Sequence, residues 1–197
     1  MRIAVLASGN GSNFEAIADF FQREHVPAEI AFVFSDKKNA FVLKRAEKFA
    51  IPTFHFSPKD FANKAAYEAA LLTLFQQEKI DLIVLAGYMR IIGGTLLSAF
   101  PKKIINIHPS LLPAFPGLHG IKDAYDYGVK VTGVTIHYID AGVDTGPIIA
   151  QVPVCIAPED SLESLEMKIH QAEHRLYPKV LKEIALSQEI DLGNHWH

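Results

Sequence analysis

Apolar runs bounded by turn residues recur along the chain and predict the elements of an α/β fold. Five of these runs have the length of a buried strand, and segments with the period of an amphipathic helix separate the first four. The five runs lie at residues 3–7, 29–35, 52–56, 81–87 and 103–107. Because strands that alternate with helices form βαβ units, we expect a mostly parallel, Rossmann-like sheet with helices on both faces.

Two longer apolar runs follow in the second half of the chain, at residues 131–140 and 147–156. The segment AGVDTG joins them, and its two glycines and its aspartate suit a tight turn. We therefore expect an antiparallel C-terminal strand addition to the sheet. A helix from about residue 161 to residue 186 is predicted to close the pattern, with a cap at Asp160 or Ser161.

Length and composition indicate one domain, expected over residues 1–190, with a flexible tail over residues 191–197. Of the 197 residues, 49% are hydrophobic and 21% are charged, and no apolar run reaches the roughly 18 residues of a membrane span. The first residues are typical of a buried strand and not of a signal peptide, so we expect no membrane association and a cytoplasmic location.

The tail contains two histidines, His195 and His197. They could bind a metal ion, but a frayed terminus is the more common interpretation of such a segment.

Net charge and cysteine content narrow the function classes. The formal net charge is -3 without a long basic block, so we expect no nucleic acid partner. Cys155 is the only cysteine, which excludes an internal disulfide and a cysteine-based metal site. Its apolar neighbours predict a packing role in a strand, and no metal is expected.

The segment SGNGSN, residues 8–13, follows the first predicted strand and opens a helix. Glycines let backbone amides approach a ligand closely, and a helix N-terminus favours an anion, so a phosphate is expected here. A plain strand-to-helix turn is the alternative.

The same segment differs from the known nucleotide-binding motifs. Phe14 occupies the place of the third glycine of a dinucleotide fingerprint, although Asp36 lies roughly where a ribose-binding acid would be. A nicotinamide cofactor is therefore disfavoured, and the Gly-Lys-Ser/Thr ending of an ATP-binding loop is missing.

A polar pair, Asn106 and His108, ends the fifth apolar run. Residues two apart in a strand point the same way, so both side chains share one face. Taken alone, the pair could be a turn cap and a core histidine. Three prolines follow within a few residues, at 109, 113 and 116, and they lower the entropy of holding the pair in place, as preorganised hydrogen-bond donors require.

Asp144 lies in the turn between the two later strands. If the first of these strands lies beside the strand that carries Asn106, this carboxylate can reach the His108 imidazole. Turn aspartates are common, so Asp144 alone indicates little. An amide, an imidazole and a carboxylate at one sheet edge form a plausible acyl-transfer site, and no enzyme nucleophile is needed if the substrate supplies an amine. Cys155 and Ser110 have no evident relation to His108, which makes a covalent acyl-enzyme the weaker hypothesis.

The loop LAGYMRII follows the fourth apolar run and presents Met89 and Arg90 between apolar residues. A flat heteroaromatic ligand would suit such a loop, because methionine adapts its shape and backbone groups can line the pocket. A strand that simply ends and turns is the alternative.

These motifs together resemble the phosphoribosylglycinamide formyltransferase family, the folate-dependent formyl transferases of purine synthesis. The resemblance rests on SGNGSN, LAGYMRI, NIHPSLLPAFPGLHG, HYIDAGVDTGPII and QAEHRLYP, in this order over essentially the whole chain. It implies the formyltransferase form of the sheet and attack by the amine of glycinamide ribonucleotide on the formyl carbon of 10-formyltetrahydrofolate. Asn106 and a protonated His108 would stabilise the tetrahedral oxyanion, while Asp144 holds His108 and assists proton transfer.

The same resemblance implies how the ribonucleotide binds. Backbone amides of Gly11, Ser12 and Asn13 would hold its phosphate, and Glu173 would contact its ribose. From its place in the closing helix alone, Glu173 would belong to a solvated acidic face. His170 stands where lysine or glutamine is usual in the family.

The resemblance also implies the folate site. The residues expected along the folate are Met89, Arg90, Ile91, Ile92 and Asn106. The pterin would lie near Asp144 and the glutamate tail near Lys64, where family members often have arginine.

Three alternatives share some of these features. A formyltetrahydrofolate hydrolase uses the same Asn, His and Asp but usually has an N-terminal regulatory domain, whereas this sequence begins at its first predicted strand. Methionyl-tRNA formyltransferase needs an RNA-binding domain and a basic surface. A non-catalytic module that binds a sugar phosphate would use SGNGSN but would not need Asn106, His108 and Asp144 together. The expected assembly is a monomer or a homodimer.

Overall fold

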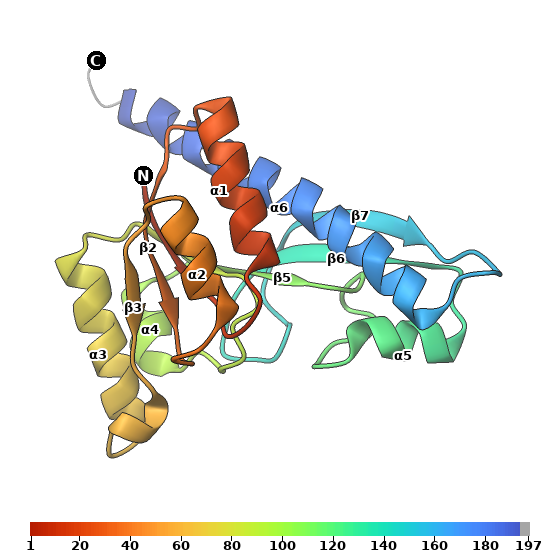
Figure 1. The fold of residues 1–197 in the computed structure, drawn as a ribbon, viewed down its shortest axis with the longest axis horizontal. Helices are drawn as coiled ribbons and strands as arrows, with labels where there is room; N and C mark the ends of the chain where they lie inside the picture. The colour runs from red at the N-terminus through yellow and green to blue at the C-terminus, as the bar shows by residue number, and fades with distance from the viewer. Residues whose placement is uncertain (194–197) are drawn as a thin grey trace.

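A computed structural model describes residues 1–193, which form a seven-stranded sheet flanked by helices (Figure 1). The strands lie in the order β3-β2-β1-β4-β5-β6-β7. Strands β1 to β5 are parallel, and β6 and β7 extend the sheet as antiparallel strands. The strands are β1 (Arg2–Leu6), β2 (Glu29–Ser35), β3 (Thr53–His55), β4 (Leu82–Leu85), β5 (Ile104–His108), β6 (Val131–Tyr138) and β7 (Ile148–Cys155). The predicted mostly parallel sheet with an antiparallel C-terminal addition is confirmed.

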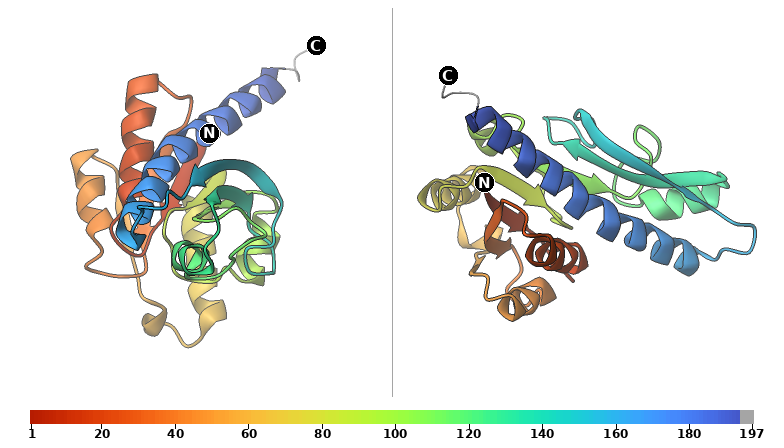
Figure 2. Two further views of the ribbon diagram at one scale, coloured as in Figure 1. Left: turned by 90° about the vertical axis from the view of Figure 1, so that its right-hand side faces the viewer. Right: turned by 90° about the horizontal axis from the view of Figure 1, so that it is seen from above.

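The helices divide between the two faces of the sheet (Figure 2). They are α1 (Ser12–Glu24), α2 (Phe41–Lys48), α3 (Lys64–Gln77), α4 (Gly94–Ala99), α5 (Gly120–Tyr127) and α6 (Leu162–Gly193), with a short 3-10 helix η1 (Pro58–Asp60) before α3. Ile3 and Val5 of β1 pack with α1, α2 and α6, whereas Ala4 and Leu6 pack with α3 and α4. Because both faces are covered, the central strands β1 and β4 are almost entirely apolar and show no polar alternation.

Helix α6 crosses the sheet and ties its central strands together (Figure 1). It begins next to Ser161, whose Oγ accepts a hydrogen bond from the backbone amide of Ser164 at 3.0 Å. The hydroxyl of Tyr177 donates to the carbonyl of Leu85 at 2.8 Å and to that of Ile105 at 3.3 Å. These bonds join α6 to the end of β4 and to the first half of β5.

The closing helix is longer than its sequence pattern predicts, because it continues through Gly193. The first three residues of the expected tail are therefore helical. The rest of that tail, residues 194–197 with His195 and His197, lies outside the described residues.

Two short helices were not expected from the pattern. Helix α4 has six residues, too few for a periodic apolar pattern to stand out, and α5 follows the proline- and glycine-rich segment, which is typical of a loop. The packing role predicted for Cys155 is wrong, because its side chain at the end of β7 is exposed and does not pack in the core. It lies at the sheet edge, where one side of the strand faces solvent.

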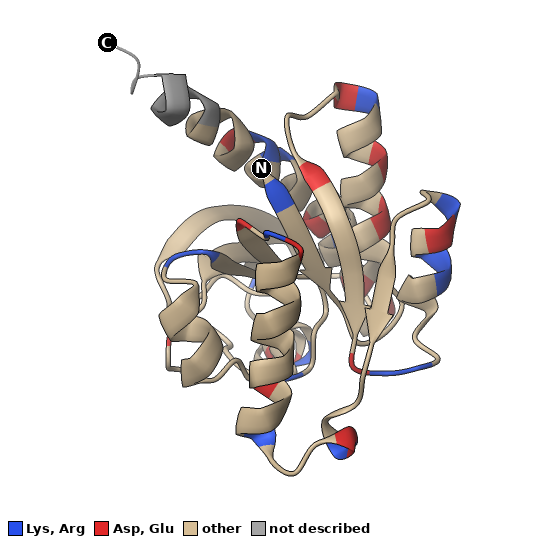
Figure 3. Cartoon of the chain, turned by 90° about the vertical axis from the view of Figure 1, so that its left-hand side faces the viewer, with Lys and Arg blue, Asp and Glu red and all other residues tan. Residues whose placement is uncertain are grey.

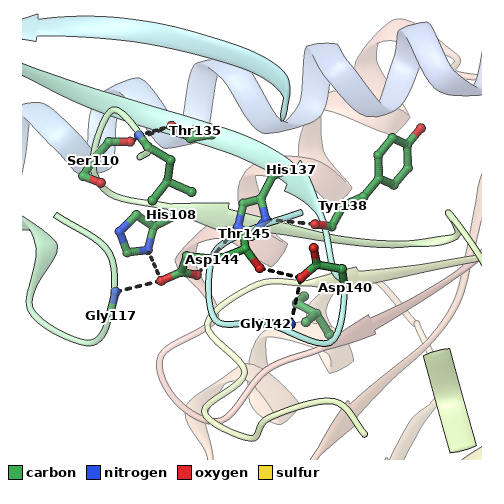
Figure 4. Close-up of polar contacts among 12 residues, drawn as sticks. His108, Ser110, Gly117, Thr135, His137, Tyr138, Asp140, Gly142, Asp144 and Thr145 are labelled. Carbon is green, nitrogen blue, oxygen red and sulfur yellow. Dashed lines mark hydrogen bonds and ion pairs between the residues drawn. The ribbon is translucent and has the colours of Figure 1, made fainter. Parts of the chain in front are cut away.

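The proline-rich segment, residues 109–117, is fastened to β6 through Thr135. The Thr135 hydroxyl donates to the carbonyl of Ser110 at 2.7 Å and accepts from the amide of Leu112 at 3.1 Å. Figure 4 shows Ser110 and Thr135 joined in this way beside His108. The segment is therefore held by a buried side chain as well as by its prolines.

Charges of both signs are interspersed on the helices seen from the β3 edge (Figure 3). None of the described helices combines the length and the apolar character that a membrane crossing requires.

Candidate active site

A cavity of about 650 Å³ opens at the carboxyl ends of β1, β4 and β5. Parallel strands bring the loops that follow them to one edge of the sheet, which is where ligands bind in open α/β folds. The segments that line the cavity are residues 9–13, 85–92, 106–109, 117–118, 139–140 and 142–144, together with His170 and Glu173 of α6. The glycine-rich loop, the loop after β4, the segment with Asn106 and His108, and the turn with Asp144 thus share one cavity.

His108 and Asp144 face each other at one end of the cavity (Figure 4). His108 is the last residue of β5, and Asp144 lies in the loop between β6 and β7 with a φ of 54°. The His108 Nδ1 atom is 3.6 Å from Asp144 Oδ2, and their side chains are 5% and 12% exposed. As the sequence analysis required, β6 lies directly beside β5.

The second ring nitrogen fixes how His108 is oriented. His108 Nε2 is 2.8 Å from the carbonyl oxygen of Phe115, which can only accept, so Nε2 carries the proton. Nδ1 is then the nitrogen that faces the Asp144 carboxylate. The amide of Gly117 donates to Asp144 Oδ2 at 2.7 Å, so the proline-rich segment positions both groups.

Asn106 lines the cavity two residues before His108 on the same strand. In the antiparallel ladder Asn106 pairs with His137 of β6. The sequence prediction that Asn106, His108 and Asp144 meet at one sheet edge agrees with this geometry, while their catalytic roles stay predictions.

His137 is a functional candidate that the sequence analysis missed. Its Nε2 atom is 3.8 Å from Asp144 Oδ1, and this buried nitrogen has no hydrogen-bond partner among the described residues. Its Nδ1 atom is 3.0 Å from the carbonyl oxygen of Tyr138, the next residue. Burial lowers the pKa of His137, against the opposing effects of the Tyr138 carbonyl and the Asp144 charge. Asp144 therefore lies between two imidazoles, and the register of β6 against β5 was the signal needed to find the second.

The glycine-rich loop forms another end of the cavity. Gly11 precedes α1 with a φ of 79°, and no side chain caps the first turn of the helix. Val42 of α2 packs so closely that a Cβ on Gly11 would lie 2.5 Å from its Cγ2. Gly11, Ser12 and Asn13 all line the cavity, so the helix N-terminus opens into it. Such an end binds anions.

Helix α6 completes this end of the cavity. Glu173 is buried, so the solvated face expected from its helix position is wrong, and its Oε2 accepts from Asn13 Nδ2 at 3.2 Å. His170 Nδ1 is 3.2 Å from the same carboxylate, which raises the pKa of His170 against a smaller lowering by burial. His174, which the sequence analysis gave no role, has Nε2 at 3.1 Å from Ser12 Oγ. Burial lowers the pKa of His174.

The loop after β4 forms the open end of the cavity. Met89 and Ile91 are 61% and 69% exposed, whereas Ile92 is buried. Arg90 lines the cavity, and its side chain donates from Nε to Asp36 at 2.8 Å. Asp36, considered above as a ribose-binding acid, is thus engaged by protein groups and is not among the lining residues.

Lys64 is the predicted binding residue that the structure does not bring to the cavity. It is exposed at the start of α3, away from the lining residues. Among the described residues, no group of three or more His, Cys, Asp or Glu side chains could hold a metal ion.

Comparison with known proteins agrees with this architecture. The family model described as formyl transferase matches residues 1–181. The chain is 53% identical to a phosphoribosylglycinamide formyltransferase of Bacillus subtilis over 183 residues, which are 93% of this chain and 94% of that protein. It is 42% identical to a trifunctional purine biosynthetic protein of Drosophila melanogaster over 91% of this chain but 14% of that protein. A solved structure of glycinamide ribonucleotide transformylase 1 from Geobacillus kaustophilus is similar with a TM-score of 0.91 and 54% identity, covering 93% of this chain and 98% of that one.

Proposed function

The chain belongs to the formyl transferase family, and on that basis we propose that it formylates glycinamide ribonucleotide with 10-formyltetrahydrofolate in purine synthesis. The observation that carries the proposal is the cavity itself. Its wall combines a helix N-terminus suited to a phosphate with a buried imidazole–carboxylate pair around one space of about 650 Å³. A substrate with a phosphate at one end and an amine at the other fits this arrangement.

The reaction needs no enzyme nucleophile, because the substrate amine attacks the formyl carbon directly. A carbon–nitrogen bond forms and the formyl oxygen becomes an oxyanion. When the intermediate collapses, the bond from the formyl carbon to N10 of the folate breaks. N10 takes up one proton and the attacking amine gives up one.

Asn106 and His108 stabilise the oxyanion in this proposal. Asn106 and His108 both line the cavity, and the strand fixes their spacing. Donors that are already aimed when charge develops need no rearrangement in the transition state. Asp144 at 3.6 Å holds the His108 ring and stabilises a proton added at Nδ1.

The phosphate and the ribose bind at the glycine-rich loop. The amides of Gly11, Ser12 and Asn13 receive the phosphate at the start of α1, where the helix dipole adds favourable potential. Glu173 faces the same space from α6 and accepts hydroxyl hydrogen bonds from the ribose. Its contact with Asn13 links the two parts of this site.

The folate lies along the loop after β4, over Met89, Arg90, Ile91 and Ile92. Exposed apolar side chains beside a cavity give a flat ring system a surface to cover. Lys64 is exposed outside the cavity, so it acts only on the far end of the glutamate tail.

The test follows the folate absorbance when the purified protein is mixed with 10-formyltetrahydrofolate, with and without glycinamide ribonucleotide. Deformylation that requires the ribonucleotide is the expected result. Release of formate without an acceptor would identify a hydrolase instead. Binding of the sugar phosphate without any turnover would identify a binding module and refute the catalytic roles.

A further inference from the structure

Asp36 is a buried carboxylate at the end of β2 that the reaction does not use. Its side chain is 0% exposed, whereas its partner Arg90 is 47% exposed. Oδ2 accepts from Arg90 Nε at 2.8 Å, and Oδ1 accepts from the Ser8 hydroxyl at 2.6 Å. Burying a charged carboxylate is costly unless it is paired and hydrogen-bonded. These two contacts compensate for the burial of Asp36.

Ser8 relays the contact to the backbone of the loop after β4. Its hydroxyl accepts from the amide of Met89 at 2.9 Å, and its own amide donates to the carbonyl of Gly87 at 2.9 Å. Asp36 therefore reaches two successive residues of that loop by two routes. It holds the Met89 backbone through Ser8 and the Arg90 side chain directly.

The two routes meet at the open end of the cavity. Ser8 follows β1, Asp36 follows β2, and residues 89–90 follow β4. Three neighbouring strands thus contribute to one hydrogen-bonded cluster beneath the loop. The bond to Asp36 uses Nε, the inner nitrogen of the guanidinium, and Arg90 is one of the residues that line the cavity.

We propose that Asp36 is a positioning residue for the folate end of the cavity. It sets the conformation of residues 88–92 and the direction of the Arg90 guanidinium without touching either substrate. The inference rests on the proposed function, because it requires the formyl folate to occupy this loop. It gives Asp36 a role different from the ribose contact considered in the sequence.

The test compares two substitutions of Asp36 in the purified full-length chain. Asp36→Ala removes both contacts and is expected to raise the KM for formyl folate about tenfold, the effect of losing a charge-assisted hydrogen bond. The KM for glycinamide ribonucleotide and the kcat should stay within about twofold. Asp36→Asn should restore most of the folate affinity, because the amide can accept from Arg90 and donate to Ser8.

A third variant isolates the backbone route. Ser8→Ala keeps the Asp36–Arg90 pair but removes the hydroxyl that holds the Met89 amide. It should raise the KM for formyl folate by about threefold, less than Asp36→Ala. This variant also keeps the inference testable if Asp36→Ala does not fold, since an unchanged folate KM in Ser8→Ala would contradict it.

Asp81→Ala is the matched control. Asp81 is an exposed carboxylate that directly precedes β4, and it accepts from the amide of Arg2 at 2.7 Å, at the amino-terminal end of the parallel strands. Its loss should leave both KM values unchanged. Binding of a stable formyl folate analogue, measured by calorimetry, gives a readout that does not depend on turnover.

The outcomes separate this inference from the proposed function. A wild-type protein that transfers no formyl group refutes the proposed function. A wild-type protein with normal transfer, beside an Asp36→Ala variant with unchanged folate KM, refutes the inference alone. Equal increases in both KM values, without recovery in Asp36→Asn, would show that Asp36 serves only general stability.

Discussion

Two parts of the cavity, the inner end at His108 and Asp144 and the open end at the loop after β4, are built in different ways. At the inner end His108 and Asp144 are almost fully buried, and backbone groups of the proline-rich segment hold both. At the open end Met89 and Ile91 expose more than half of their side chains. There the backbone and Arg90 are fixed from below, while the apolar side chains face outward.

This difference matches two kinds of work. Hydrogen-bond donors that act on a developing charge are effective only when they are aimed in advance, so they need rigid support. A surface that covers an apolar ring gains mainly from contact area, which adaptable side chains can provide. Substitutions at the inner end should therefore lower the rate, and substitutions at the open end should weaken binding.

The largest effect is expected from Asn106→Ala. Loss of one aimed donor typically lowers turnover by about a hundred- to a thousandfold, or about 2.7–4 kcal/mol. Steady-state kinetics should show this loss in kcat, with both KM values within about threefold of wild type. A variant with normal kcat would remove Asn106 from the oxyanion site.

Asn63→Ala is the control for the loss of an asparagine side chain. Asn63 caps α3 by accepting from the amide of Ala66 at 2.9 Å. Its loss should cost about 1 kcal/mol of stability without lowering kcat.

Gly11→Ala should give the next largest effect and tests the phosphate end. The new Cβ meets Val42, which is fully buried, and a φ of 79° is strained for alanine. The loop must shift, so the KM for glycinamide ribonucleotide should rise about tenfold or more. Thermal unfolding should show a loss of about 1–3 kcal/mol.

Gly9→Ala provides the matched control for that loop. A Cβ on Gly9 would have no atom within 4 Å, and its φ is not in the left-handed region. Its melting temperature should equal that of the wild type. An equally large loss of stability in Gly9→Ala would mean that the clash with Val42 is not the cause.

Ile91→Ala should have a smaller effect, confined to folate binding. Loss of apolar contact by an exposed side chain should weaken formyl folate binding by about threefold to tenfold, with kcat unchanged. A large fall in kcat would contradict the division of work between the two ends.

The smallest expected effect is a change in how stability depends on pH. The Glu173 contact raises the pKa of His170 above 6.5. The contact therefore stabilises the folded state fully below pH 6.5, and this stabilisation is lost as the pH rises through the raised pKa. His170→Gln should remove this contribution, so its melting temperature should fall relative to wild type at low pH and approach it at high pH.

His174→Gln should change the pH dependence in the opposite sense. Burial lowers the pKa of His174 below 6.5, so its contribution is present above pH 6.5 and is lost as pH falls through the lowered value. Thermal melts of both variants between pH 5 and 9 check the two signs together. Parallel curves for the two variants would contradict the assigned contacts.

Much of the fold could be predicted from the sequence, because strands buried on both faces produce long apolar runs. The position of Asp144 beside His108 was predicted on the condition that β6 lies next to β5. His137 was missed because its proximity to Asp144 depends on strand register, which the alternation of residues does not specify. Helix α4 was missed because it is short, and α5 because it follows a proline- and glycine-rich segment that is typical of a loop.

Burial and cross-chain hydrogen bonds were the least predictable features. Glu173 lies on a helix with a mixed surface, and only the packing of α6 against α1 shows that it is buried. Asp36 was noticed for its spacing, but its actual partners lie 28 and 54 residues away along the chain. Such contacts depend on tertiary structure that a local pattern does not contain.

The most direct test of the account is the single-turnover rate of formyl transfer by His108→Ala. The variant, saturated with glycinamide ribonucleotide, is mixed rapidly with saturating 10-formyltetrahydrofolate. The account predicts a rate at least about a hundredfold below wild type. It also predicts dissociation constants for both substrates within about threefold of wild type. A His108→Ala variant that transfers the formyl group at the wild-type rate would contradict the assignment of catalysis to the inner end of the cavity.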